Sequence, residues 1–190
     1  MDNKQEKKYQ SEKKLLERIR SGDKEAFEQL FYTYFFDLCS FAMQITSSAE
    51  KARDVVQEVF YNIWRRRSSW RVHTSLKAYL FQSVRNEALD QLEREQHFDK
   101  IREEMAELKP KKSLSPKGDQ DPVDEKLIRE IWTIVSSMPQ RRRSVFILHR
   151  RHGLSYKEIA HILDVTRKTV ENHMGLALKD IREQLTHDWT

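Results

Sequence analysis

Apolar side chains recur at intervals of three and four residues along most of this chain, and no segment shows the sustained alternation of a half-buried strand. The helical period is clearest in three stretches: one rich in aromatic residues, one that begins near Ala49 and one that begins near Ser75. Their expected inward residues are, in order, Phe27, Leu30, Phe31, Tyr34, Phe35, Leu38 and Phe41; Ala52, Val55, Val56, Val59, Phe60 and Ile63; and Leu76, Leu80, Val84 and Ala88. The pattern therefore predicts an all-α fold.

The stretch from Gly153 to Leu185 predicts two further helices joined by a tight turn. Ser155 and Glu158 have the spacing of a capping box, in which each side chain satisfies a backbone group at a helix start. The first helix should therefore begin at Tyr156. Its expected apolar stripe consists of Ile159, Ala160 and Leu163.

The turn between these two helices is expected at residues 164–166. Asp164 tolerates left-handed backbone angles better than most residues, and the Thr166 hydroxyl can cap the second helix. A helix-turn-helix whose second helix has a polar outer face can enter the major groove of DNA. We expect that helix to face inward with Val170, Met174, Ala177, Ile181 and Leu185, and outward with Lys168, Glu171, Asn172 and Gly175.

The charge balance favours limited contact with a polyanion. The 190 residues include 35 Lys and Arg against 30 Asp and Glu, which gives a net charge of +5. This mild excess suits a DNA-binding protein that also needs acidic faces for another partner. The single cysteine, Cys39, excludes a disulfide framework within one chain, and we find no apolar leader or run of membrane-spanning length. We therefore expect a cytoplasmic protein without direct membrane insertion.

A segment poor in apolar residues divides the chain. Three of the four prolines lie at positions 110, 116 and 122, which favours a flexible linker. We expect two small helical domains joined by this linker, the C-terminal one a helix-turn-helix. The expected divisions are a polar N-terminal tail at residues 1–14, a helical domain at 15–108, the linker at 109–122 and the helix-turn-helix domain at 123–190.

No constellation of side chains suggests a catalytic, metal or cofactor site. His149, His152 and His161 lie near one another in sequence, but structural zinc needs four ligands and no cysteine accompanies them. Asp54 and Glu58, four residues apart, could suggest a metal-dependent nuclease, yet no further acidic or histidine cluster accompanies them. We expect a protein that is not an enzyme and has no cofactor and no metal.

Three segments, taken in order, resemble a bacterial RNA polymerase sigma factor of the sigma-70 family, in its extracytoplasmic-function (ECF) group. DVVQEVFYNIW at residues 54–64 resembles the helix that grips the clamp of core polymerase, and LKAYLFQSVRNEALDQLER at 76–94 resembles the helix that opens and reads the downstream promoter element. The sequence from Met138 to Leu185 resembles the domain that reads the upstream element. The resemblance implies a promoter-specificity subunit with a region 2-like and a region 4-like domain, whose partners are core RNA polymerase, promoter DNA and an anti-sigma factor.

The resemblance also implies roles for particular residues. Aromatic side chains can stack on unpaired bases while cations follow the backbone, and Arg or Lys can read guanine as Asn reads adenine. The loop Ser68 to Ser75 should capture a flipped base. The expected polymerase-binding residues are Asp54, Gln57, Glu58, Phe60 and Trp64; the expected DNA-binding residues are Arg66, Arg67, Trp70, Arg71, Arg85, Asn86, Arg167, Lys168, Glu171 and Asn172.

Several alternatives stay open at this point. Tyr79 stands where the family usually has tryptophan and Ser83 where an apolar residue is usual, so Tyr79 could equally be a packing residue. Arg143 could contact phosphate or pair with Glu158 to join two helices. The segment TVENHMGLALKDI also resembles response-regulator DNA-binding domains, which would make the chain a dimeric regulator that binds operators alone. The N-terminal block lacks the strand and helix alternation and the phosphoacceptor cluster of a receiver domain.

Overall fold

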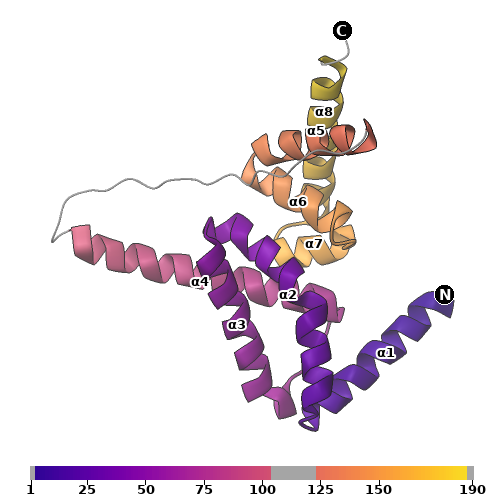
Figure 1. The fold of residues 1–190 in the computed structure, drawn as a ribbon, viewed down its shortest axis with the longest axis vertical. Helices are drawn as coiled ribbons and strands as arrows, with labels where there is room; N and C mark the ends of the chain where they lie inside the picture. Colours follow the sequence, from indigo (N-terminus) through magenta and orange to yellow (C-terminus); the bar gives the residue numbers. More distant parts are fainter. Residues whose placement is uncertain (1–2, 104–122, 188–190) are drawn as a thin grey trace. The chain divides into compact units, whose positions relative to one another are not determined.

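The computed structural model describes residues 3–103 and 123–187, and these form eight α-helices and one short 3-10 helix, with no strand among them (Figure 1). The all-α prediction is thus confirmed for the described residues. The chain divides into two compact units, Met1–Leu108 and Lys109–Thr190. The expected linker at 109–122 lies outside the described residues. Among the helices described, none is both long and apolar enough to cross a membrane.

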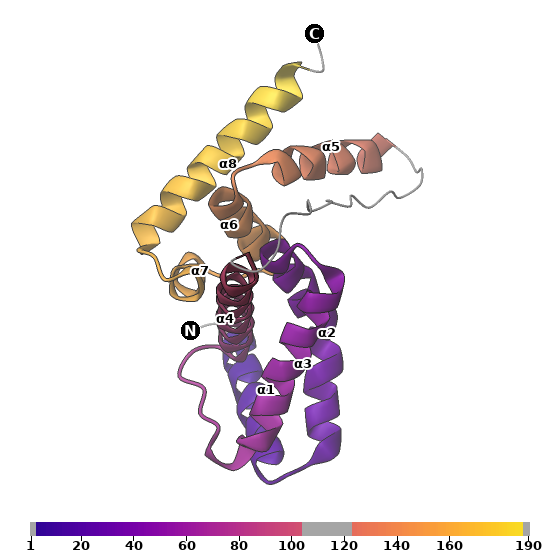
Figure 2. The same ribbon diagram turned by 90° about the vertical axis from the view of Figure 1, so that its left-hand side faces the viewer.

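The N-terminal unit has a core of three helices. α2, α3 and α4 pack against one another, and α1 contacts both α2 and the 3-10 helix η1. Figures 1 and 2 both show α2 and α3 side by side. The inward residues expected on α3 and α4 are all buried, so the helical period identified both faces. The bounds are α1 Asn3–Arg20, α2 Lys24–Thr46, α3 Ala49–Arg65, η1 Arg67–Ser69 and α4 Leu76–Glu103.

Side-chain caps fix where α2 and α3 begin. The Asp23 carboxylate accepts a hydrogen bond from the Ala26 N–H at 3.1 Å, and the Ser48 hydroxyl accepts one from the Lys51 N–H at 3.3 Å. Between the two helices, Ser47 adopts a left-handed conformation with φ of 54°. These caps set the sharp reversal that brings α3 back against α2.

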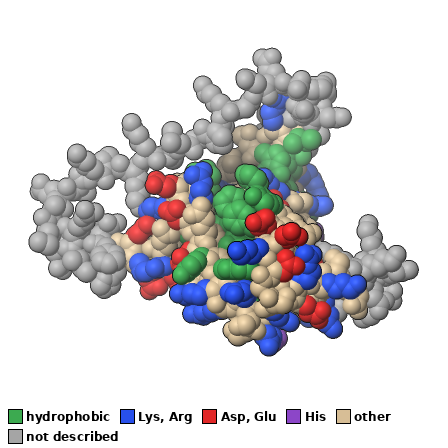
Figure 3. Space-filling model, turned by 60° about the horizontal axis from the view of Figure 1, so that its bottom comes forward, with side chains coloured by type: hydrophobic (Ala, Val, Ile, Leu, Met, Phe, Trp, Pro, Cys, Tyr) green, Lys and Arg blue, Asp and Glu red, His purple; other side chains and the backbone are tan. Residues whose placement is uncertain are grey.

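The aromatic helix α2 departs from the expected continuous buried face. Leu30, Leu38 and Phe41 are buried, but the other four expected core residues, Phe27, Phe31, Tyr34 and Phe35, are only half-buried. The physical reason is that so many bulky residues span more of the helix circumference than its neighbours cover. Tyr32 and Phe36 project outward with 72% and 78% of their surface exposed. Figure 3 shows one face of the molecule on which hydrophobic side chains remain visible among interspersed acidic and basic groups.

The N-terminal helix is longer than its polar sequence suggested. We expected a polar tail at residues 1–14, but α1 runs from Asn3 to Arg20. Lys, Glu and Gln have high intrinsic helix propensity, so a segment without an apolar stripe can still be helical. Ile19 is fully buried at the end of α1, and Gly22 turns the chain with φ of 89°.

The C-terminal unit is organised around α8, which contacts α5, α6 and α7. The expected inward face of α8 is buried at Val170, Met174 and Ala177 and half-buried towards its end. On α7 the buried residues are Ile159 and Ile162, whereas Ala160 and Leu163 are half-buried, so the expected stripe was displaced around the helix. The bounds are α5 Val123–Ser137, α6 Gln140–Arg150, α7 Tyr156–Leu163 and α8 Arg167–His187.

Candidate protein and nucleic-acid interfaces

A polar face of α3 points away from the core. Asp54, Gln57 and Glu58 are exposed, as their helical spacing predicts. The Glu58 carboxylate accepts a hydrogen bond from Asn62 Nδ2 at 2.8 Å, and Asn62 Oδ1 accepts one from Arg65 Nη2 at 2.7 Å. Sequence reasoning missed Asn62 and Arg65, although their spacing of four and three residues was the available signal. The result is a connected polar surface suited to a protein partner.

Phe60 and Trp64 lie on another side of α3. Phe60 is only 2% exposed, and its ring centroid lies 6.0 Å from that of Phe27 and 4.9 Å from that of Phe31. Trp64 is half-buried and packs on Phe27 at 4.8 Å. Phe60 faces α2 and supports α3 from the core, and its expected role in polymerase binding stays a prediction.

Two arginines of the basic loop after α3 form contacts within the protein. Arg67 Nη1 donates to the Trp64 carbonyl at 2.9 Å, and its guanidinium lies over the Trp64 ring at 4.5 Å. Arg71 is exposed but donates to the Trp70 carbonyl at 3.1 Å. Arg66 is exposed. Arg67 thus has an internal contact with Trp64, and its expected role in DNA binding stays a prediction.

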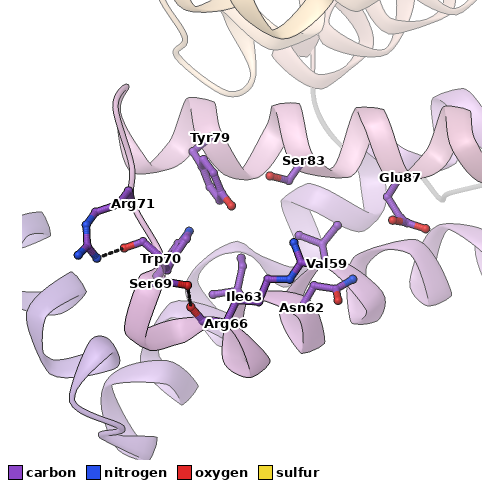
Figure 4. A pocket seen from close by; sticks show the side chains of 10 residues that line it. All are labelled: Val59, Asn62, Ile63, Arg66, Ser69, Trp70, Arg71, Tyr79, Ser83 and Glu87. Atoms are coloured by element: carbon purple, nitrogen blue, oxygen red, sulfur yellow. Dashed lines mark hydrogen bonds between the residues drawn. The ribbon is translucent and has the colours of Figure 1, made fainter.

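A pocket of about 450 Å³ lies between α3, this loop and α4 (Figure 4). Trp70, expected to stack on a base, is only 5% exposed and lies 5.7 Å from the ring of Tyr79. Trp70 therefore forms a wall of the pocket, and its expected stacking on a base stays a prediction. The lining residues are Val59, Asn62, Ile63, Arg66, Ser69, Trp70, Arg71, Tyr79, Ser83 and Glu87.

The pocket is polar as well as aromatic. In Figure 4, Tyr79, Ser83 and Glu87 project from α4 towards residues of α3 and the loop. Glu87 accepts a hydrogen bond from Arg94 Nη2 at 2.8 Å. Ser83, which replaces an apolar residue, places a hydroxyl-bearing side chain on the pocket wall. Aromatic walls, two arginines and several polar groups are the chemistry that holds an unpaired base and its phosphate.

One residue of this site comes from α1 and was not predicted. Arg20 Nε donates to the Trp70 carbonyl at 2.9 Å in a partly buried position. The two residues are 50 positions apart, so no local pattern could have identified the contact.

The two α4 residues expected to contact DNA lie outside the pocket lining. Asn86 is exposed and Arg85 is half-buried. Their expected contact with the promoter strand stays a prediction.

The turn of the helix-turn-helix has the expected geometry. Ser155 and Glu158 form a complete capping box, in which the Glu158 carboxylate accepts the Ser155 N–H at 2.8 Å. Asp164 is left-handed with φ of 54°, and the Thr166 hydroxyl accepts the Thr169 N–H at 3.1 Å. The caps at both helix starts therefore fix the direction in which α8 leaves the turn.

The expected DNA-reading residues lie at the beginning of α8. Lys168 and Asn172 are exposed. Glu171 pairs with Arg167 at 3.1 Å and with Lys168 at 3.9 Å. These exposed pairs are weak and can be exchanged for contacts with a base or a phosphate.

An arginine does join two helices of this unit, but by a different pairing from the one considered. Arg142 on α6 forms an ion pair with Asp180 on α8. Arg143 Nη2 donates to the Met138 carbonyl at 2.8 Å. Arg141 and Arg150 are exposed on the same helix.

Two ionisable side chains of α2 have a shifted pKa, and neither belongs to a cluster of possible metal ligands among the described residues. No group of three His, Cys, Asp or Glu among them could hold a metal ion. Burial raises the pKa of Tyr34 to about 12, with Glu12 and Asp37 adding to the effect. Burial also raises the pKa of Cys39 against the opposing charge of Arg53, which keeps this thiol protonated at neutral pH.

Two protein families match the chain in the order of its two units. The family described as Sigma-70 region 2 matches residues 30–98, which contain the α3 face, the loop and the pocket. The family described as Sigma-70, region 4 matches residues 128–181, which contain the helix-turn-helix. Together the two matches span more than half of the chain.

Curated relatives of comparable length align along most of the chain. The RNA polymerase sigma-H factor of Pseudomonas aeruginosa is 23% identical over 185 residues, which cover 93% of this chain and 94% of the relative. The ECF RNA polymerase sigma-E factor of Escherichia coli is 27% identical over 173 residues, covering 88% and 90%. The ECF RNA polymerase sigma factor SigM of Bacillus subtilis is 26% identical over 140 residues, covering 73% and 82%.

Two solved structures share the fold. CnrH, solved in complex with the cytosolic domain of CnrY, has a TM-score of 0.61 and 19% identity, covering 94% of this chain and 99% of that one. The sigma factor RpoE of Bartonella quintana, solved with the anti-sigma factor NepR, has a TM-score of 0.60 and 22% identity, covering 84% and 96%. At these identities the likeness concerns the fold.

Proposed function

The chain belongs to the sigma-70 family, in its extracytoplasmic-function group, and we propose that it works through three surfaces: the α3 polar face, the pocket beside the α3–α4 loop, and the start of α8. A member of this family is a promoter-specificity subunit of RNA polymerase and acts in transcription initiation. The observation that carries the proposal is the ordered pair of family matches, each of which contains one or two of these surfaces.

We propose that the α3 polar face binds core RNA polymerase. Asp54, Gln57 and Glu58 are exposed together, and Glu58 is oriented by Asn62. An acidic and polar face on a chain with net charge +5 suits a protein partner better than DNA. Trp64 contributes at the half-buried edge of this face, and Phe60 supports it from the core.

We propose that the pocket receives an unpaired base of the downstream promoter element. Trp70 and Tyr79 supply an aromatic wall, while Arg66 and Arg71 lie where they can neutralise the strand. Asn86 and Arg85 would contact the strand beside the pocket. Capture of a base that has left the duplex stabilises melted DNA over closed DNA, which is how such a site promotes opening.

We propose that α8 reads the upstream element in the major groove. Arg167 and Lys168 at the helix start can contact guanine or phosphate, Asn172 can contact adenine, and Glu171 can accept from cytosine. Arg141 and Arg150 on α6 are exposed and available to phosphate. The affinity of this unit alone can be modest because polymerase holds the complex on the promoter.

Sigma factors are DNA-binding regulatory subunits, and we propose that polymerisation chemistry belongs entirely to the partner enzyme. An anti-sigma factor is the proposed inhibitor of this chain, supported by the co-crystal partner of the RpoE relative. We propose that this chain acts in the cytoplasm, where polymerase and promoter DNA are found.

The direct test is reconstituted transcription. Purified full-length protein is added to core RNA polymerase on genomic templates, and transcript starts are mapped. The proposal predicts new, discrete starts that depend on the protein. No gain in specific initiation, together with tight operator binding by the protein alone, would favour a conventional regulator and refute the proposal.

A further inference from the structure

The loop that closes the pocket is held from outside by the N-terminal helix. Within η1 its backbone bonds are local, since the Ser69 and Trp70 N–H groups donate within the same turn at 3.0 and 3.2 Å. The contact from Arg20 Nε to the Trp70 carbonyl, at 2.9 Å, instead joins the loop to α1. η1 as a whole also contacts α1. The loop therefore has a fixed point on a helix that forms no part of the pocket wall.

The end of α1 provides a firm base for this contact. Ile19, next to Arg20, is fully buried, and Arg18 Nε pairs with the Asp23 carboxylate at 2.7 Å. Arg20 itself is half-buried, so its hydrogen bond is shielded from water more than one on the open surface. A cation in the last turn of a helix is also favoured by the helix dipole.

The carbonyl that Arg20 holds belongs to the residue that forms the pocket wall. Trp70 follows η1 in extended backbone, with φ of −62° and ψ of 123°. Its carbonyl also accepts a hydrogen bond from Arg71 Nη1 at 3.1 Å, but Arg71 is the next residue of the same loop, so only the Arg20 bond of these two ties the carbonyl to another helix. Holding its carbonyl restrains the backbone at Trp70, and so the point from which the indole enters the pocket wall, while packing against Tyr79 restrains the ring itself. The indole is tilted by 58° against the Tyr79 ring, with 5.7 Å between the two ring centroids.

We propose that Arg20 is a positioning residue for the pocket: by holding the Trp70 carbonyl, it keeps the aromatic wall in the orientation that accepts an unpaired promoter base. The inference rests on the proposed function, which assigns the promoter strand to this pocket. Arg20 acts through Trp70 and does not itself contact DNA. The C-terminal turn of α1 therefore belongs to the strand-capture apparatus, although its sequence carries none of the family's motifs.

The test uses the full-length protein bound to core RNA polymerase, on a promoter that the wild type selects from randomised templates. 2-Aminopurine placed along the downstream element reports base unstacking by its fluorescence. We expect Arg20→Gln to lower open-complex formation about tenfold, the scale of losing one hydrogen bond to a charged group. Arg20→Lys keeps the charge but changes the donor geometry, so it should lose about threefold. The matched control, Lys14→Gln at an exposed position of α1, should open the promoter like the wild type.

A merely structural role would lower stability and every binding step together. We therefore expect the affinity for core polymerase and the binding of upstream duplex to be unchanged in Arg20→Gln and Arg20→Lys, and the thermal midpoint to fall by no more than the loss of one hydrogen bond explains. Opening equal to wild type in either variant overturns the inference, as does a loss matched by equal loss of polymerase affinity. If Arg20→Gln does not fold, Arg20→Lys decides by the same criteria. A wild-type protein that opens no template would instead refute the proposed function and this inference with it.

Discussion

The two units differ in how their candidate DNA-binding side chains are held within the protein. In the N-terminal unit, Arg67 and Arg71 donate to backbone carbonyls and Trp70 is buried in the pocket wall. In the C-terminal unit, Arg167 and Lys168 are exposed at the start of a regular helix and pair with Glu171 on that helix, in weak ion pairs that DNA contacts can replace. The first unit offers a preformed site that a base must enter, whereas the second offers an open surface whose contacts form on docking.

This difference assigns different consequences to substitution. A preformed site depends on the core and loop that shape it, so a buried change there should disturb folding and function together. An open helix face depends on its own side chains, so changes there should alter binding and leave stability intact.

Phe60→Ala should destabilise the N-terminal unit by about 3–5 kcal/mol, because it removes a buried ring packed on Phe27 and Phe31. Tyr61→Ala, one residue further on the same helix, is the matched control and should cost less than about 0.5 kcal/mol, because Tyr61 is 56% exposed. Denaturant unfolding of the full chain measures both. Equal stability of the two variants would show that Phe60 does not support the fold as described.

Lys168→Ala and Asn172→Ala should each weaken binding to the preferred upstream sequence by about 1–3 kcal/mol and relax the preference at one position. Stability should not change, since both residues are exposed. Binding of polymerase loaded with each variant to a library of upstream sequences measures the effect, and Lys179→Ala further along α8 is the control. If affinity falls equally for every sequence, the two residues position phosphate and do not read bases.

Glu58→Lys should weaken core polymerase binding about tenfold. The variant removes a carboxylate from the proposed interface and puts a positive charge in its place. The helix-turn-helix should keep its upstream DNA affinity. Titration of labelled polymerase gives the first quantity and duplex binding the second. Glu183→Lys, an equal charge change on α8, should leave polymerase affinity as it was; a comparable loss there would point to net charge and not to the α3 face.

The smallest effect concerns the cap of α2. The pKa of Asp23 is lowered from 3.8, first by the hydrogen bond from the Ala26 N–H and then by the Arg18 side chain. A lowered folded-state pKa means that the ionised carboxylate stabilises the fold above pH 3.8 and that this contribution disappears as pH falls below it. Asp23→Asn keeps a side chain that can cap the helix but removes its charge. The thermal midpoint of this variant should therefore lie slightly below that of the wild type at pH 6, and the two midpoints should converge in acid. A difference between the two thermal midpoints that grows in acid would contradict a stabilising role for the ionised Asp23 carboxylate.

The sequence was most informative where the chain is a regular helix. The inward faces of α3, α4 and α8 and the caps at Asp23, Ser155 and Thr166 followed from periodicity and local hydrogen bonding. Local rules could not say that seven bulky residues overfill the inward face of α2, nor that α1 continues through a polar segment.

The candidate site was less predictable than the fold because it lies where helices end. Whether Arg67 faces DNA or Trp64, and whether Trp70 is free or buried, depends on tertiary contacts that residue type does not specify. The contact from Arg20 and the pairing of Arg142 with Asp180 join residues far apart in sequence. Such contacts become visible only when the elements are assembled.

The central claim is that this chain reads two promoter elements only as part of a polymerase complex. Its most direct test is nuclease footprinting of one selected promoter with the chain alone, core polymerase alone and both together. The account predicts that both elements are protected, and the downstream one melted, only when the two are combined. Equal protection of both elements by the chain alone, unaffected by polymerase, would contradict it.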